Sequence, residues 1–360
     1  MGVLKNIKRV FINRCLREKI NKDISKYKYV HIMFNDKFNK PFVDLLNKYL
    51  NSSEHMVLCK RVFYNDAVQP FPVGDNVYEF IKLKGLDLGN TNVEKIIFHS
   101  LFFSDVIDYL YEHKEVLAKS YWRIWGGDLY NATRDKKNDY VRRNFKGYIG
   151  IIDREYALNK YNMQDNFYKM FYRFPLSKTM LDNTKREKYK PLTIQINHSC
   201  NKTTLEMLDI LSKFKDENIR IRTIVSYGKY MEYKEPIIKK GRAIFGDKFE
   251  YLEDYISPKE YAQYLAQNDI LILNQRQQQG FGNTLAALYL GQKVYIRKDI
   301  SINKYLNKDS IKIFNSEEIE NLDFKEFISY SQKEENIKNT TKYLKDEYLA
   351  ELMVRFFDEK

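Results

Sequence analysis

The feature that most constrains the fold is a stretch in the second half of the chain, residues 269–296, with the sequence DILILNQRQQQGFGNTLAALYLGQKVYI. Residues 270–273 are all apolar, which is typical of a short strand buried on both faces of a parallel sheet. A polar loop follows, then an apolar helix that ends at a glycine, then a second apolar run. The pattern predicts a strand, loop, helix and strand within an α/β domain.

The polar loop of this stretch is suited to binding an anion. It lies at the carboxyl end of its strand, the edge at which open α/β sheets bind their ligands. The helix N-terminus offers free backbone N–H groups, glycines allow close approach, and glutamines and one arginine add donors. We expect a phosphate or diphosphate here; the alternative is an ordinary polar surface loop. The candidate residues are Asn274, Arg276, Gln278, Gln279, Gly280, Gly282, Asn283 and Thr284.

A second anion-binding loop is expected after the strand predicted at residues 192–197, where polar residues open another helix. Two such loops on neighbouring strand ends suit a diphosphate, whereas either alone is equally explained as a helix cap. The loops after the next two strands are expected to hold the base and ribose of a nucleotide, or to be plain turns. The candidates in these loops are Asn197, His198, Ser199, Thr203, Tyr227, Gly228, Asp254 and Tyr255.

Predicted strands and helices alternate through both halves of the 360-residue chain. This order indicates an α/β protein with two Rossmann-like, parallel-sheet domains. We expect a first domain over residues 1–176, a Lys- and Arg-rich linker over 177–191 and a nucleotide-binding domain over 192–335. Residues 336–360 are expected to form a helix that packs back on the first domain.

The charge balance favours an anionic partner. The chain carries 61 Lys and Arg against 48 Asp and Glu, a formal charge of +13. Basic residues cluster at the start, where apolar residues recur near helical spacing, so a basic amphipathic helix on an anionic membrane is expected. The alternative is a helix packed on its own domain. The basic residues proposed for membrane contact are Lys5, Lys8, Arg9, Arg14 and Arg17.

Composition also bears on the compartment of the protein. No apolar run approaches the roughly 20 residues that span a bilayer, and no leader-like segment is recognised at the start, so we expect a soluble or peripheral cytoplasmic protein. Cys15, Cys59 and Cys200 are scattered, as expected of free thiols in a reducing compartment. Neither an Asp-X-Asp motif nor a His/Cys cluster at ligand spacing is present. No metal or other cofactor is therefore expected.

The first domain offers candidates for acid–base chemistry. Asp128 follows a Gly-Gly turn after a predicted strand and is the first candidate for the general base. Asp36, in the loop after another predicted strand, is the second candidate. His99 ends a third strand and is a candidate to bind a substrate hydroxyl. Trp125 and Gly127, in the same turn as Asp128, are candidates to contact a substrate. The alternatives are that Asp128 caps a helix and that His99 is a core residue.

Residues 279–294, QGFGNTLAALYLGQKV, resemble the donor-diphosphate loop and helix of two-domain GT-B glycosyltransferases. Many of those enzymes carry glutamates where this chain has Gln279 and Ala287. The stretch NQRQQQGFGN is instead similar to the bacterial 4-acetamido-4,6-dideoxygalactose (Fuc4NAc) transferases of glycosyltransferase family 56. Further similar segments are WRIWGGDLY at 122–130, VSYGKY at 225–230 and IFGDKFEYLEDYISPKEYAQYL at 244–265.

This resemblance implies a GT-B fold and a metal-independent hexosyltransferase. The enzyme would move a Fuc4NAc-like sugar from a dTDP-sugar to a lipid-linked saccharide on a polyprenyl diphosphate carrier, for polysaccharide assembly. It would work as a peripheral protein at the cytoplasmic face of the bacterial inner membrane, without nucleic acid as a partner. The competing hypotheses are a non-catalytic GT-B-like scaffold of a polysaccharide complex and a basic nucleic-acid-binding protein.

Overall fold

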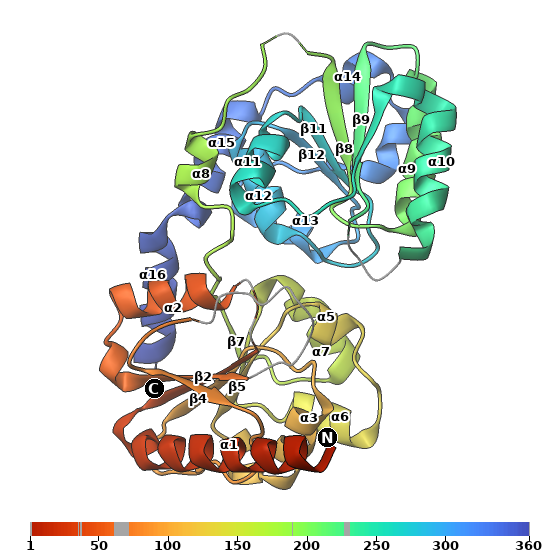
Figure 1. Cartoon of the computed structure of the whole chain (residues 1–360). Coiled ribbons are helices and arrows are strands. Elements are labelled where there is room, and N and C mark those ends of the chain that lie inside the picture. Colours follow the sequence, from red (N-terminus) through yellow and green to blue (C-terminus); the bar gives the residue numbers. More distant parts are fainter. Residues whose placement is uncertain are drawn as a thin grey trace. The chain divides into compact units, whose positions relative to one another are not determined.

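The structure is a computed structural model that describes residues 2–34, 36, 38–60, 72–188, 190–226 and 231–359, with side chains from residue 12 onward. The chain divides into two compact units (Figure 1). Unit 1 comprises Met1–Arg173 and Asp346–Lys360, and unit 2 comprises Phe174–Lys345. Residues 177–191, where the sequence predicts a linker, contain helix α8 and belong to unit 2, whereas the last helix, α16, belongs to unit 1.

Unit 1 is built on a parallel sheet, which has seven strands within the described residues, in the order β3-β2-β1-β4-β5-β6-β7. The strands are β1 (Tyr29–Phe34), β2 (His55–Lys60), β3 (Val77–Phe80), β4 (Lys95–Phe98), β5 (Ser120–Arg123), β6 (Gly147–Ile149) and β7 (Phe167–Tyr168). Its α-helices are α1 (Gly2–Asp23), α2 (Asn39–Tyr49), α3 (Ser104–Glu112), α4 (Lys114–Leu117), α5 (Gly127–Tyr130), α6 (Lys136–Arg143), α7 (Arg154–Tyr161) and α16 (Asp346–Asp358).

Side chains along β1 point alternately to the two faces of the sheet, and both faces are covered. Val30 and Ile32 point to one face, where they join the core formed with α1 and α3. His31 points to the other face, where its ring contacts Phe42 of α2 and Phe357 of α16. Helices on both faces are what an all-parallel sheet requires.

Unit 2 repeats this plan with a parallel sheet of six strands among the described residues, in the order β10-β9-β8-β11-β12-β13. The strands are β8 (Leu192–Ile196), β9 (Ile219–Ile224), β10 (Phe249–Leu252), β11 (Ile270–Leu273), β12 (Lys293–Ile296) and β13 (Phe314–Asn315). Its α-helices are α8 (Lys178–Asp182), α9 (Lys202–Leu211), α10 (Lys234–Phe245), α11 (Pro258–Ala266), α12 (Phe281–Tyr289), α13 (Ser301–Lys308), α14 (Phe324–Ile328) and α15 (Lys333–Thr340).

The core of unit 2 has two layers. Helices α9 and α10 pack on one side of the sheet through residues such as Leu208 and Ile237. A second cluster joins α8, α11 and α12 through Leu181, Leu265 and Ala286. The strand–loop–helix–strand predicted at residues 269–296 is β11, its loop, α12 and β12, and the expected α/β class is confirmed.

In each sheet the strand order reverses once. The reversal falls between β1 and β4 in unit 1, and between β8 and β11 in unit 2. Open α/β sheets bind ligands in the crevice at the carboxyl ends of the strands that flank such a point. In unit 2 these ends carry both loops that the sequence predicts as anion sites. In unit 1 they carry Asp36 and His99.

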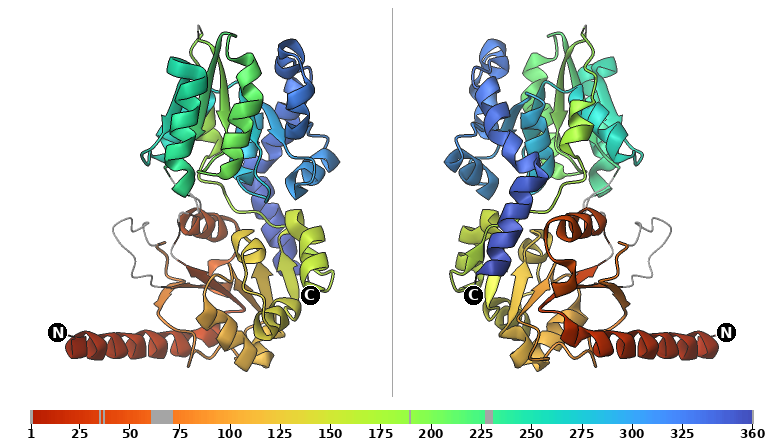
Figure 2. Two further views of the ribbon diagram at one scale, coloured as in Figure 1. Left: turned by 90° about the vertical axis from the view of Figure 1, so that its right-hand side faces the viewer. Right: turned by 90° about the vertical axis from the view of Figure 1, so that its left-hand side faces the viewer.

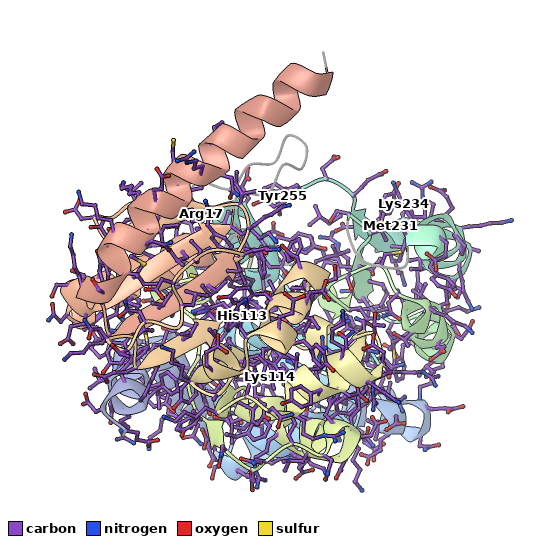
Figure 3. All side chains as sticks on the ribbon, turned by 90° about the horizontal axis from the view of Figure 1, so that it is seen from below. Arg17, His113, Lys114, Met231, Lys234 and Tyr255 are labelled. Carbon is purple, nitrogen blue, oxygen red and sulfur yellow. The ribbon has the colours of Figure 1, made fainter. Side chains whose placement is uncertain are left out.

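The C-terminal part of helix α1 packs on the rest of unit 1. Ile20 is buried, Asn21 donates to the Gly85 carbonyl at 2.9 Å, and Arg17 lies against Gly85. The N-terminal part of α1 extends past the rest of unit 1 (Figures 2 and 3). The side chains of Lys5, Lys8 and Arg9 lie outside the described residues, and Arg14 pairs with Glu18 on the same helix. None of the helices in the described ranges is long and apolar enough to cross a bilayer.

Candidate active site

Asn197 fastens the two anion-site loops of unit 2 together. Its backbone has a left-handed φ of 52°, a conformation that asparagine adopts more readily than most residues. The Oδ1 atom accepts from the Asn274 backbone N–H at 3.0 Å, and Nδ2 donates to the hydroxyls of Thr204 at 2.9 Å and Thr203 at 3.2 Å. Asn274 in turn accepts from Ser316 at 2.9 Å. Three residues predicted as ligands, Asn197, Thr203 and Asn274, are therefore bonded to other parts of the protein, and we assign them to holding the loops.

Gly280 directly precedes helix α12, and its backbone conformation favours glycine. Its φ of 71° and ψ of 29° place it in the left-handed region. A Cβ atom on Gly280 would lie 2.6 Å from Cδ2 of His198. The first backbone bond of the helix runs from the Thr284 N–H to the Gly280 carbonyl at 2.8 Å, so the N–H groups before Thr284 have no acceptor within the helix. The two loops thus meet at an uncapped helix N-terminus.

His198 is the buried side chain of this meeting point. It is 2% exposed, and burial lowers its pKa to about 3, so the imidazole is neutral at physiological pH. Its Nδ1 lies 3.3 Å from Gln195 Nε2 and 3.4 Å from the Tyr261 hydroxyl. Its Nε2 is buried without a hydrogen-bond partner among the described residues. An unsatisfied buried ring nitrogen beside Gly280 indicates a polar ligand at this point.

The rest of the β11 loop adds polar groups with different exposure. Gln275 is buried, its Nε2 has no partner in the described part of the chain, and it lines a small pocket. The other lining residues are Leu273, Gln277, Gln279, Ile296, Ile300 and Ile302. The Arg276 side chain is 68% exposed and pairs with Glu206 at 3.4 Å. Surface ion pairs contribute little free energy, so replacing this contact by one to a ligand costs little. The loop therefore offers an exposed guanidinium next to the buried Gln275 amide.

The remaining residues predicted to line the anion and nucleotide site are less informative. Ser199 is buried, and Gln278, Gly282 and Asn283 are half-buried. The Cβ position of Gly282 lies 2.5 Å from the Phe174 ring, so a side chain has no room there. Asp254 and Tyr255 are exposed in the loop after β10 (Tyr255 in Figure 3). Tyr227 and Gly228 lie outside the described residues.

In unit 1, Asp128 holds the loops at the carboxyl edge of the sheet. It is 2% exposed, and its carboxylate accepts from the Leu101 N–H at 2.9 Å, the Trp125 N–H at 2.9 Å and Trp122 Nε1 at 2.8 Å. Burial raises the pKa of Asp128 while these three hydrogen bonds oppose the rise. Asp36, the other carboxylate candidate, is exposed and accepts from the Phe38 N–H at 3.2 Å.

His99 belongs to a buried chain of imidazoles. His31 Nδ1 lies 2.9 Å from His99 Nε2, and His31 Nε2 lies 3.1 Å from His55 Nδ1. His99 Nδ1 is hydrogen-bonded to the Tyr172 hydroxyl. Burial lowers the pKa values of all three histidines, that of His55 to about 4. The register explains this row of imidazoles, because His55 in β2, His31 in β1 and His99, directly after β4, lie on one face of adjacent strands.

Aromatic rings connect this row of imidazoles to the residues predicted to contact the acceptor substrate. The Trp125 Nε1 donates to the His99 carbonyl at 2.8 Å, and its ring centroid lies 4.7 Å from Tyr172 and 4.6 Å from Phe38. Ser100, next to His99, has a strained φ of 145° and a buried hydroxyl without a partner among the described residues. His99, Trp125 and Asp128 are therefore brought together at one edge, and Gly127 opens α5 beside them.

Comparison with known proteins assigns the family. The family model described as "4-alpha-L-fucosyltransferase glycosyl transferase group 56" matches residues 88–351, which is most of the chain. The chain belongs to glycosyl transferase group 56. A comparison with curated proteins finds no match. The match covers the unit 1 edge from His99 onward and all of the described unit 2 loops, so the predicted Fuc4NAc-transferase resemblance is confirmed.

Solved structures similar to this group 56 chain share its fold at low identity. A glycosyltransferase from Rickettsia africae has a TM-score of 0.66 at 12% identity, covering 93% of this chain and 98% of its own. The UDP-forming trehalose-phosphate synthase of Burkholderia vietnamiensis gives 0.64 at 8%, covering 92% and 100%. HepE of Anabaena, solved with UDP and glucose, gives 0.61 at 11%, covering 93% and 100%. These likenesses confirm the GT-B fold.

Several residues of this group 56 site were not predicted from the sequence. They are His31, His55, Tyr172, Gln195 and Gln275. A signal existed for two of them, because His31 and Gln195 interrupt otherwise apolar strands and a buried polar side chain needs a partner. Tyr172 had no such signal, since its partner is 73 residues away in the chain.

Proposed function

We propose that this glycosyltransferase moves a Fuc4NAc-like deoxy-acetamido sugar from a dTDP donor to a saccharide on a polyprenyl diphosphate. Unit 2 binds the nucleotide sugar and unit 1 the acceptor. The observation that carries the donor half is the buried, unpartnered His198 Nε2 at the uncapped N-terminus of α12. Backbone N–H groups, the helix dipole and a buried donor together form a site for a diphosphate.

The β11 loop carries protein groups that are suited to stabilise the leaving diphosphate. Arg276 is exposed and its partner Glu206 is half-exposed, so its guanidinium is available to a phosphate without a large desolvation cost. In the same loop, the buried Gln275 Nε2 is a further donor, and it has no hydrogen-bond partner among the described residues. We propose that these groups stabilise the charge on the departing diphosphate and that transfer proceeds without a metal ion. Within the described residues no group of three His, Cys, Asp or Glu side chains is placed to hold a metal.

For the general base we propose Asp36. It is exposed at the carboxyl end of β1, beside the reversal point of the unit 1 sheet, whereas the Asp128 carboxylate is buried and accepts three hydrogen bonds. A base must reach the acceptor hydroxyl directly or through one water. We assign Asp128 to positioning Trp125, and His99 to holding that ring through its carbonyl.

The basic start of the chain supports the proposed acceptor and location. Helix α1 carries Lys5, Lys8, Arg9, Arg14 and Arg17, and its N-terminal part extends past the rest of unit 1 (Figure 2). We propose that this part lies on the anionic cytoplasmic face of the bacterial inner membrane, which would bring the active site to a lipid-linked acceptor. Flotation of the full chain with vesicles of phosphatidylglycerol, compared with neutral phosphatidylcholine vesicles, tests this point.

The donor assignment is tested by nucleotide binding. Calorimetric titration of the full chain with dTDP, UDP, GDP and CMP in the presence of EDTA should show the tightest binding for dTDP. Arg276→Ala should weaken it about tenfold, the value of one charge-assisted contact. Equal affinity for all four nucleotides, or no binding of any, would contradict the donor assignment.

A further inference from the structure

Three buried polar side chains form a hydrogen-bonded row behind the donor loop. Asn268 Nδ2 donates to Gln195 Oε1 at 2.6 Å, and Gln195 Nε2 lies 3.3 Å from His198 Nδ1. Asn268 and Gln195 are fully buried and His198 nearly so. Gln195 interrupts the apolar strand β8, and Asn268 lies two residues before β11, so the row runs beside the two strands that flank the reversal point.

The hydrogen bonds of this row determine which atoms donate and which accept. Because Gln195 Oε1 accepts from Asn268, its Nε2 faces His198, and the same Nε2 also donates to the Asn197 carbonyl at 3.2 Å. An amide nitrogen only donates, so His198 Nδ1 must accept. The Tyr261 hydroxyl, at 3.4 Å, is the titratable group that faces Nδ1 from α11, and it can donate to the same atom. A neutral imidazole has one N–H, so the proton of His198 lies on Nε2.

The protonated Nε2 atom points to the start of α12. It lies 3.3 Å from the Cβ position of Gly280, the residue that directly precedes that helix, and it is buried without a partner among the described residues. A buried N–H without an acceptor destabilises the folded protein, because it has lost its hydrogen bonds to water. An acceptor supplied by a ligand removes this cost.

We infer that Gln195 and Asn268 are positioning residues that hold His198 as a neutral Nε2–H donor to the diphosphate of the sugar nucleotide. This inference rests on the proposed donor site. During transfer the bond between the anomeric carbon and the diphosphate oxygen breaks, and its electron pair stays on that oxygen. The anomeric carbon bonds to the acceptor oxygen, whose proton goes to the base. The His198 proton stays on Nε2 throughout and stabilises the charge that develops on the leaving oxygen.

The row also explains why His198 is not a cation. An imidazolium would carry a second N–H on Nδ1, directed at the Gln195 Nε2–H and the Tyr261 hydroxyl. Burial already disfavours the charged form and lowers the pKa to about 3. His198 therefore does not change its protonation state between about pH 6 and 8, and it remains an Nε2–H donor throughout this range.

The test uses the full chain and one matched pair of substitutions. Gln195→Met keeps the volume and removes the amide that fixes Nδ1 as an acceptor. Gln292→Met is the control, since Gln292 is also fully buried in unit 2, and its Nε2 donates to the Leu265 carbonyl at 2.6 Å. Nitrogen-15 spectra of the imidazoles report the tautomer, and thermal unfolding reports whether both variants remain folded. Inorganic diphosphate and dTDP are the probes.

In the wild type and in Gln292→Met we expect His198 to be the Nε2–H tautomer and its Nε2 signal to shift when diphosphate is added. In folded Gln195→Met we expect both tautomers and about tenfold weaker binding of dTDP. Wild-type affinity in Gln195→Met, or a His198 Nε2 signal that saturating diphosphate leaves unmoved, would overturn the inference. A shift with diphosphate but no binding of dTDP would leave the inference standing and reject the dTDP donor.

Discussion

The buried histidines make unit 1 sensitive to mild acid. His31, His55 and His99 are neutral in the folded protein, because burial lowers the pKa of each below its ordinary value of 6.5. Neighbouring charges also shift these pKa values. Arg123 lowers the pKa of His99 further, whereas Glu54 partly offsets the lowering of the His55 pKa. Unfolding exposes the imidazoles to water, where they bind protons below pH 6.5. Folding stability must therefore fall as the pH falls through this value.

The size of the loss follows from the linkage relation. Each imidazole that stays neutral in the fold costs about 1.4 kcal/mol per pH unit below 6.5. At pH 5 this amounts to about 2 kcal/mol for each histidine and about 6 kcal/mol for the three in unit 1. The loss from His55 stops growing near pH 4, its folded pKa. Since domains are stable by only about 5–15 kcal/mol, unit 1 should be close to unfolding at pH 5.

The assay is urea unfolding followed by tryptophan fluorescence. Both tryptophans of the chain, Trp122 and Trp125, belong to unit 1, so the signal reports that unit alone. With a slope of about 2 kcal/mol per molar urea, a loss of 6 kcal/mol lowers the midpoint by about 3 M between pH 7.5 and pH 5. His55→Gln should reduce this shift by about one third.

His113 provides the control, because its side chain is exposed on the surface of unit 1 (Figure 3). His113→Gln should leave the pH dependence of the midpoint unchanged. A midpoint that moves by less than about 0.5 M in the wild type would refute the argument that these imidazoles are held neutral. An equal effect of the His55 and His113 substitutions would refute it as well.

Three substitutions test the loops. Gly280→Ala should weaken dTDP binding at least tenfold and cost about 1–3 kcal/mol in unfolding experiments, since the residue is left-handed and its Cβ would meet the His198 ring. Asp128→Asn should cost about 3 kcal/mol in the same experiments, because an amide N–H would then face backbone or indole N–H donors. Arg276→Ala should reduce kcat/KM about tenfold and leave the melting temperature unchanged, because its side chain is exposed.

The main elements of the fold were predictable because they carry strong local signals. Strand β11 is continuously apolar, and the helix after it begins and ends at glycines. The strands β3, β7 and β13 were not predicted, since two to four residues show no periodicity and their pairing depends on neighbours in the sheet.

The candidate site was predictable as a set of loops but not as a set of roles. Polar residues at strand ends identified the two anion-site loops, because the topology of parallel sheets brings such ends together. The sequence does not show that the Asn197 side chain is bonded to Asn274, 77 residues away, or that the Asp128 carboxylate accepts from Leu101. Side chains of one type at one edge differ in their partners, and only the fold decides which of them remain available to a ligand.

The most direct measurement of the central claim is sugar transfer by the purified full chain. Radiolabelled dTDP-Fuc4NAc is incubated with a polyprenyl-diphosphate-linked saccharide in EDTA, and label in the lipid extract is compared for the wild type and Asp36→Asn. We predict label in the lipid fraction with equimolar release of dTDP, and a fall of about 100-fold or more in folded Asp36→Asn. Failure of the folded wild type to transfer label, or undiminished transfer by Asp36→Asn, would contradict the account.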